Sequence, residues 1–255
     1  NIGFELMDVA ADGAETSDLV DPWFALFNQV TLGFYWRIFE PQEGRPDTER
    51  LLSAAKWFKD RGARVKGHPL AWHTLAPQWL LGRPLAEVEA TLRARITREA
   101  STFAGLVDHW DAINEAVIMP RFTAEDNAIT PLAQKLGRVE MVRLAFETAR
   151  EANPNAKLVL NDFLLTPEYA QLIEDCLSAG IQIDALGLQT HMHQGFRGED
   201  ELGEILERFG AFGLPLQFTE TTLVSGELMP EHIVDLNDYQ VDGWPSTPGG
   251  EERQA

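Results

Sequence analysis

The sequence predicts an α/β fold, a (β/α)₈ TIM barrel whose C-terminal part is incomplete, and three observations predict it. Short apolar runs alternate with amphipathic segments along the chain, which is typical of parallel strands covered by helices. Polar or ionisable residues end five successive runs, as at the mouth of a barrel. No glycine-rich phosphate loop follows the first run, which disfavours a doubly wound dinucleotide-binding fold. We therefore expect residues 1–255 to form one barrel domain, irregular over 223–255.

Five segments show the apolar spacing of three to four residues that marks a helix with one buried face. Thr-Pro pairs stand at the start of two of them and glycines at the end of three, which is the expected capping chemistry. The segments are 51–62, 85–103, 130–149, 166–180 and 202–213.

Seven short apolar runs between these segments are candidate strands. They are Ile2–Phe4, Val30–Phe34, Val65–Trp72, His109–Ile113, Leu158–Leu160, Ala185–Leu188 and Leu216–Phe218. The remaining part, 223–255, is rich in Gly, Pro and acidic residues and holds no eighth strand. Either segments are absent from the sequence, or the chain is a fragment, or another chain fills the gap. We expect a monomer unless another chain completes the barrel.

Composition narrows the class of partner. A chain of 255 residues that is 44% hydrophobic can bury one substantial core. With 21 Lys and Arg against 40 Asp and Glu, the formal net charge of −19 argues against a nucleic-acid partner. No apolar run of about 18 residues predicts a membrane span, and the first residues, NIGFELMD, lack the features of a signal peptide. The single cysteine, Cys176, excludes an internal disulfide and is expected in the core.

Two glutamates stand out among the polar residues at the ends of the runs. Glu115 and Glu220 each follow apolar sequence directly, and neither has a cation four residues on. The C-terminal ends of barrel strands converge on one face, so we expect the two carboxyl groups to meet there. Two such groups are the minimum equipment for cleaving a glycosidic bond. The other polar residues at these ends are His68, His73, Asn114, Asn161, Asp162, Gln189, His191 and His193.

Several of these residues have other readings. Asn161 and Asp162 could simply meet water or cap a helix, and His68 and His193 could be structural. The pair His191 and His193 has a spacing found in metal-dependent barrel hydrolases, but no His-x-His follows the first strand. We expect no metal and no cofactor.

The motifs at these strand ends closely resemble glycoside hydrolase family 10, the endo-β-1,4-xylanase family, a retaining (β/α)₈ group. The segment 66-KGHPLAWHTLAPQWL-80 is similar to the family's GHxLxWHxxxPxWL, and 110-WDAINEA-116 resembles its acid/base motif WDxxNE. The segments 161-ND-162, 187-GLQTH-191 and 218-FTE-220 resemble the family's Asn-Asp, GLQSH and nucleophile motifs. The match runs in one order from about residue 24 to 222.

The resemblance implies roles for these residues. Glu115 would be the general acid/base, Glu220 the nucleophile and Asn114 a partner of the sugar 2-hydroxyl. His191 would hold Glu220 in place. Gln189, His73 and Trp79 would line the glycone side of the site. The implied substrate is xylan or a related plant polysaccharide, and an extracellular location follows only from the size of such a polymer.

The chain also departs from the family pattern. Where the family carries TPENEMKW, this chain has 31-TLGFYWRIFEP-41, in which Trp36 or Arg37 would partly replace the lost Glu and Lys. Thr221 and Thr222 replace Leu-Asp after the nucleophile, and the family's tryptophan platform has no counterpart. A second hypothesis is therefore a catalytically weak or inactive carbohydrate-binding barrel.

Aromatic residues near the strand ends are candidate sugar-stacking groups. These residues are Trp36, Trp72 and Trp79. Trp72 and Trp110 sit inside apolar runs, so we expect both in the core.

Overall fold

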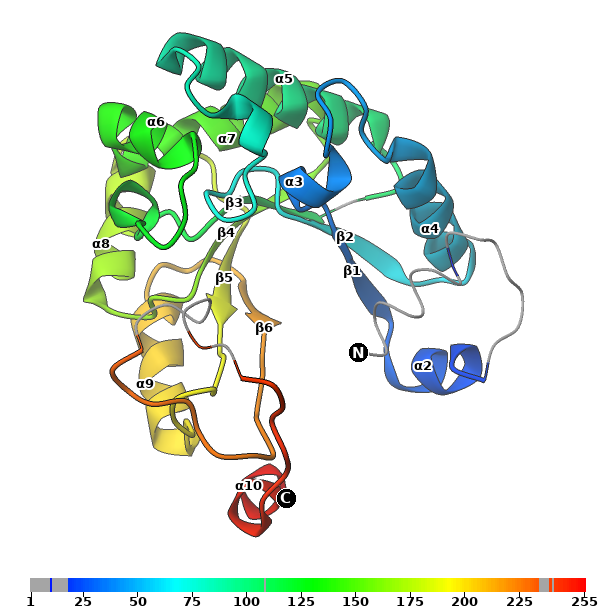
Figure 1. The fold of residues 1–255 in the computed structure, drawn as a ribbon, viewed down its shortest axis with the longest axis vertical. Helices are drawn as coiled ribbons and strands as arrows, with labels where there is room; N and C mark the ends of the chain where they lie inside the picture. Colours follow the sequence, from blue (N-terminus) through cyan, green and yellow to red (C-terminus); the bar gives the residue numbers. More distant parts are fainter. Residues whose placement is uncertain (1–9, 11–17, 108, 234–238, 240) are drawn as a thin grey trace.

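The computed structural model describes residues 10, 18–107, 109–233, 239 and 241–255. Within these residues, the chain forms one six-stranded parallel sheet in which the strand order follows the chain order. The strands are β1 (Gln29–Gly33), β2 (Arg64–His68), β3 (His109–Asn114), β4 (Lys157–Asp162), β5 (Ala185–Gln189) and β6 (Leu216–Glu220). Figure 1 shows the sheet curled into part of a barrel, with helices along its outer side.

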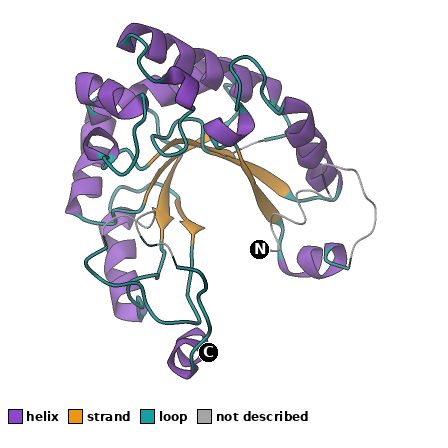
Figure 2. Cartoon of the chain, viewed as in Figure 1, coloured by secondary structure: helices purple, strands orange, loops and turns teal. Residues whose placement is uncertain are grey.

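The helices are α2 (Val20–Leu26), α3 (Trp36–Phe39), α4 (Thr48–Asp60), α5 (Leu85–Thr102), α6 (Ile129–Leu136), α7 (Arg138–Ala152), α8 (Pro167–Ser178), α9 (Glu199–Gly210) and α10 (Pro248–Gln254). Most of the helices lie in the connections between successive strands, whereas α2 precedes β1 and α10 follows β6. Two short 3₁₀ helices are η1 (Gln78–Leu80) and η2 (Met119–Arg121). Figure 2 shows the helices as an outer layer and the strands as an inner one. None of the helices in the described ranges is long and apolar enough to cross a membrane.

The sheet is buried in its middle and exposed at its two edges. Strands β2 to β5 consist almost entirely of buried residues. Strands β1 and β6 each pair with a single neighbour among the described residues, and Phe218 of β6 is 52% exposed. The structure is therefore an open, partial barrel, in agreement with the incomplete barrel predicted from the sequence.

Six of the seven predicted strands are confirmed, and the seventh, Ile2–Phe4, lies outside the described residues. The prediction for 65–72 was wrong at its C-terminal end, because β2 ends at His68. Pro69 follows and has no backbone N–H to give to a sheet ladder. The chain still runs beside β3, since the backbone N–H of Leu70 donates to the carbonyl of Asp111.

The predicted helix over 130–149 is two helices, α6 and α7. Gly137 separates them with a φ of +83°, in the left-handed region that residues with a side chain rarely adopt. Both helices keep an apolar face, which is why the sequence pattern continues across the break.

Two core predictions are confirmed. Cys176 is fully buried in α8. Trp110 is also fully buried, and its ring fills the space beside Gly67, where a Cβ would lie 2.2 Å from the ring. That contact is far shorter than any van der Waals separation, so the Trp110 ring can lie there only because Gly67 lacks a side chain.

Candidate active site

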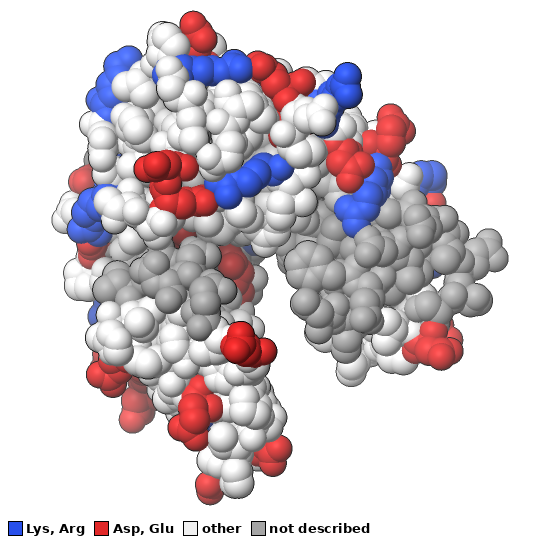
Figure 3. All heavy atoms as spheres, viewed as in Figure 1, with Lys and Arg blue, Asp and Glu red and all other residues white. Residues whose placement is uncertain are grey.

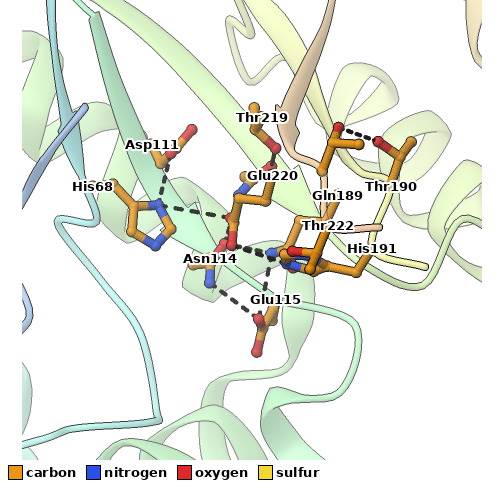
Figure 4. A network of polar contacts seen from close by, with 12 residues as sticks. His68, Asp111, Asn114, Glu115, Gln189, Thr190, His191, Thr219, Glu220 and Thr222 are labelled. Carbon is orange, nitrogen blue, oxygen red and sulfur yellow. Dashed lines mark hydrogen bonds and ion pairs between the residues drawn. The ribbon is translucent and has the colours of Figure 1, made fainter. Parts of the chain in front are cut away.

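The curl of the sheet brings the ends of β3 and β6 together. In a flat sheet, three strand spacings of about 4.8 Å would separate them by about 14 Å. Here the Asn114 amide donates to Glu115 Oε1 at 3.2 Å, and the Asn161 amide donates to both Asn114 Oδ1 and Glu220 Oε1, each at 2.8 Å. The two glutamates are thus linked through two asparagine side chains. Figure 4 shows Asn114 beside both Glu115 and Glu220.

Glycine in β5 makes this link possible. Gly187 is in register with Asn161 of the neighbouring strand, and a Cβ at Gly187 would lie 2.3 Å from Asn161 Oδ1. The asparagine side chain therefore passes over Gly187 toward β6. There the Thr219 hydroxyl donates to Asn161 Oδ1 at 2.6 Å.

Both glutamates line one pocket of about 640 Å³, a size that suits a small ligand or part of a longer one. Of the residues predicted for the site, His73, Gln189 and His191 also line it. Its aromatic wall consists of Tyr35, Trp72, Phe122, Phe163 and Phe196. A second cavity of about 790 Å³ shares Ile118, Phe163, Gln194, Arg197 and Glu201 with it, so the depression continues along the protein surface.

Glu115 lies in a strained and poorly solvated position. Its φ is +56°, which is uncommon for a residue with a side chain and is often found at functional sites. Trp72 Nε1 donates to Glu115 Oε2 at 2.8 Å, and Gln189 Nε2 donates to Oε1 at 3.3 Å. Burial, followed by the charges of Asp162 and Glu220, outweighs these bonds and raises the pKa of Glu115 to about 8. This carboxyl group therefore holds a proton at neutral pH.

Glu220 shows the opposite behaviour. Burial alone would raise its pKa, but the hydrogen bond to His191, the charge of His68 and the hydrogen bond from Asn161 outweigh burial and lower it. His191 Nε2 lies 3.4 Å from Glu220 Oε2, and His68 Nδ1 lies 4.0 Å from Oε1. Glu220 is therefore ionised at neutral pH.

A buried pair of charges supports His68. Asp111 lies between Lys66 and His68, with 2.8 Å from Lys66 Nζ to Oδ1 and 2.8 Å from His68 Nδ1 to Oδ2. Burial lowers the pKa of His68, but the hydrogen bond and charge of Asp111 outweigh it, so the pKa of His68 is raised. The sequence analysis left His68 open between a structural and a ligand role. The structure places His68 beside Glu220, and its raised pKa favours the positively charged form. The sequence analysis did not single out Lys66 or Asp111.

His73 and Trp79 differ in their placement. His73 is fully buried at the pocket wall, and its Nε2 lies 3.8 Å from Glu115 Oε2. Burial lowers the pKa of His73 to about 3, so the ring is neutral. Trp79 does not line the pocket within the described residues. Its Nε1 donates to the carbonyl of Glu40, and its ring packs edge-on against Trp36.

The segment that replaces the family motif presents a different residue from those predicted. Trp36 is buried and donates to Glu40, and Arg37 pairs with Glu125 at 2.9 Å. Neither lines the pocket among the described residues, whereas Tyr35 does. The sequence analysis missed Tyr35, although its place directly after a predicted strand was an available signal.

The core prediction for Trp72 was wrong. Trp72 is half-buried, lines the pocket and donates to Glu115. Pro69 ends β2 and so moves Trp72 into a loop at the pocket, and this proline was the signal available in the sequence.

The remaining strand-end residues lie around the two glutamates. His191 Nδ1 lies 2.9 Å from the Thr222 hydroxyl, and the His191 and His193 rings stack 4.9 Å apart. Asp162 accepts from the backbone N–H groups of Val117 and Leu164, each at 3.0 Å. Both donors lie in the loops that follow β3 and β4, so Asp162 holds these loops together and does not cap a helix. In the part of the chain that is described, no group of three or more His, Cys, Asp or Glu is arranged to hold a metal ion.

Comparisons with known proteins give one consistent result. A family model described as "Glycosyl hydrolase family 10" matches residues 7–240. An endo-1,4-beta-xylanase/feruloyl esterase of Xylanibacter ruminicola is 28% identical over 219 residues, which cover 77% of this chain and 30% of that protein. Endo-1,4-beta-xylanase B of Thermotoga neapolitana is 28% identical over 204 residues, which cover 76% of this chain and 58% of that protein.

Solved structures agree with these matches. A family 10 structure from Paenibacillus barcinonensis superposes with a TM-score of 0.75 at 25% identity, over 89% of this chain and 72% of that one. A thermostable mutant of a xylanase from Cellvibrio japonicus gives a TM-score of 0.73 at 25% identity, over 94% and 74%. The chain thus spans less than two thirds of the length of the curated relatives named above.

Proposed function

Since the chain belongs to glycosyl hydrolase family 10, we propose that it cleaves β-1,4-linked xylan or a related plant polysaccharide with retention of configuration. Glu220 is the nucleophile and Glu115 the general acid/base. The observation that carries the proposal is that the pKa values of two carboxyl groups in one pocket are shifted in opposite directions. The pKa of Glu115 is raised to about 8, and that of Glu220 is lowered. Such a pair supplies one proton donor and one nucleophile at the same pH.

The first step forms a glycosyl-enzyme. The ionised Glu220 attacks the anomeric carbon and forms a C–O bond to it, while the glycosidic C–O bond breaks. Glu115 gives its proton to the leaving oxygen, so the leaving group departs as a neutral alcohol. Glu220 is then an uncharged ester.

The second step releases the sugar. Loss of the charge on Glu220 removes one of the causes that raise the pKa of Glu115, so the ionised form of Glu115 is favoured and is present to act as the base. It takes a proton from a water molecule whose oxygen attacks the anomeric carbon, and Glu220 leaves as a carboxylate. The starting protonation states are restored.

Neighbouring residues keep Glu220 ionised and hold Glu115 in position. His68, His191 and Asn161 favour the ionised form of Glu220. Trp72 and Gln189 hold the two oxygens of Glu115 in a fixed orientation.

Covalent trapping tests the proposal. A 2,4-dinitrophenyl 2-deoxy-2-fluoro-β-xylobioside should release dinitrophenolate once and leave a fluoroxylobiosyl ester on Glu220, detected by peptide mass spectrometry. The Glu220→Ala variant should fold, carry no label and show no turnover. Proton NMR of the first product from xylohexaose should show the β-anomer. A label on another residue, or a first product in the α-form, would refute the assignment.

A second candidate function is carbohydrate binding without turnover. It is favoured by the open sheet, since β1 and β6 do not pair with each other among the described residues. Release of reducing ends from xylan, compared with simple retention of the protein on a xylan column, separates the two functions. Retention without release supports binding alone.

We further propose that the protein works outside the cell, because a polysaccharide is too large to enter cells, and that it is a monomer unless another chain completes the barrel. The charge of the protein favours a neutral polymer as substrate over a nucleic acid. On the face shown in Figure 3, basic side chains are interspersed with acidic ones, and the formal net charge is −19. Sedimentation velocity tests the oligomeric state, and culture fractionation tests the location.

A further inference from the structure

We propose that Tyr35 is a substrate-binding residue that determines specificity, and that its phenol hydroxyl donates a hydrogen bond to a hydroxyl of the sugar ring attacked by Glu220. This inference rests on the proposed function and adds a residue to its site. The residues that the sequence predicts for the site do not include Tyr35.

The position of the ring is the first argument. Tyr35 lies two residues after the end of β1 and lines the pocket that contains Glu115 and Glu220. Its ring lies edge-on to His68, with 5.6 Å between ring centroids, and 5.9 Å from the Trp72 ring. The Tyr35 ring therefore neighbours both the histidine that faces Glu220 and the tryptophan that donates to Glu115.

The state of the hydroxyl is the second argument. Among the described residues, the structure gives the Tyr35 hydroxyl no hydrogen-bond partner, although the side chain is half-buried. Burial and the charges of Glu220, Asp111 and Glu115 raise the pKa of Tyr35 to about 12. The phenol keeps its proton and is a neutral donor, which suits an uncharged sugar hydroxyl.

The surrounding sequence gives the third argument. Phe34 and Trp36, on either side of Tyr35, are buried, so Tyr35 is the residue of 34–36 that reaches the pocket. A Cβ at Gly33 would lie 3.0 Å from Tyr35 Cε2, which is closer than an ordinary contact. Gly33 has no positive φ, so its backbone does not require glycine. Its lack of a side chain leaves room for this orientation of the Tyr35 ring.

The experiment compares Tyr35→Phe and Gly33→Ala with the unaltered protein. The substrates are an aryl β-xylobioside and two analogues that lack the 2- or the 3-hydroxyl of the ring next to the aryl group. Tyr35→Phe should lower kcat/KM roughly tenfold on the parent substrate, as expected for one lost hydrogen bond. On one of the two deoxy analogues it should change nothing. Gly33→Ala should lower kcat/KM on the parent substrate in the same way, because it displaces the ring.

Tyr239→Phe is the matched control. Tyr239 packs against Trp244 and does not line the pocket, so kcat/KM should be unchanged. Equal activity of Tyr35→Phe and the unaltered protein on the parent substrate would overturn the inference. So would an equal loss on the parent and both analogues, because it would show that the residue acts only on structure.

Binding separates this inference from the proposed function. If the unaltered protein binds xylotriose in calorimetry but turns over no substrate, the proposed function fails. Roughly tenfold weaker binding by Tyr35→Phe would then still support the role of Tyr35, and equal binding would refute it. If the unaltered protein neither binds nor cleaves these sugars, both proposals fall.

Discussion

Replacing Gly187 with Ala should break the hydrogen bonds of Asn161 that link Glu220 to Asn114. The added Cβ would lie 2.3 Å from Asn161 Oδ1 and 2.9 Å from its Cγ. An ordinary contact needs about 3.5 Å, so the Asn161 side chain must move by roughly 1 Å. It then loses its bonds to Asn114 and Glu220, and Thr219 loses its acceptor.

The size of the effect follows from this geometry. Overpacking a core costs about 1–3 kcal/mol, and each lost hydrogen bond adds about 1 kcal/mol. Three bonds are lost, so we expect a loss of roughly 4–6 kcal/mol in the free energy of unfolding. A misplacement of about 1 Å in the reacting groups lowers kcat/KM about a hundredfold. Loss of the Asn161 bond also raises the pKa of Glu220, so the acid limb of the pH profile should move to higher pH.

The assay is urea unfolding together with kcat/KM for an aryl β-xylobioside between pH 4 and 9. Gly203→Ala is the control, because Gly203 lies in α9 and a Cβ there would meet no atom within 4 Å. It should leave activity unchanged and add about 0.5–1 kcal/mol of stability. Wild-type kcat/KM and an unmoved acid limb in Gly187→Ala would refute the reasoning.

Four further predictions concern Glu115 and the break between α6 and α7. Because Glu115 must be protonated to act as an acid, kcat/KM should fall above about pH 8. The Trp72→Phe variant loses a hydrogen bond that lowers the pKa of Glu115, so its kcat/KM should fall at a higher pH. A fall at a lower pH in that variant would contradict the assignment. The folded-state pKa of Glu115 exceeds the ordinary value of 4.5, so its ionisation costs stability as pH rises from about 4.5 to 8. The Glu115→Gln variant should therefore melt at a higher temperature than wild type at pH 9, and at nearly the same temperature at pH 4. The Glu115→Ala variant should retain far more activity on substrates with good leaving groups than on xylan. Gly137→Ala should lose about 1 kcal/mol in urea unfolding because of the positive φ, and equal stability would show that the backbone adapts without strain.

The sequence predicted the parts of the site that depend on strand ends. Apolar runs followed by a polar residue identified Glu115 and Glu220, because parallel strands place their C-terminal ends at one face. The break at Gly137 was not predicted, since an apolar face that continues from one helix to the next looks like a single helix. Tyr35 was not predicted because its pocket position depends on the space beside Gly33, a contact that no periodicity reports.

The strand order has a consequence for stereochemistry. Glu115 follows β3, and Glu220 is the last residue of β6. Three sheet interfaces separate these strands, so small changes of angle at each interface add up at the carboxyl groups. Enzymes that retain configuration need the groups about 5–5.5 Å apart, and those that invert it need about 6.5–9.5 Å. A widening of about 1–2 Å is thus enough to admit a water molecule between them. Under the proposed mechanism, the packing of α7 against β3 and β4 therefore bears on which anomer is released.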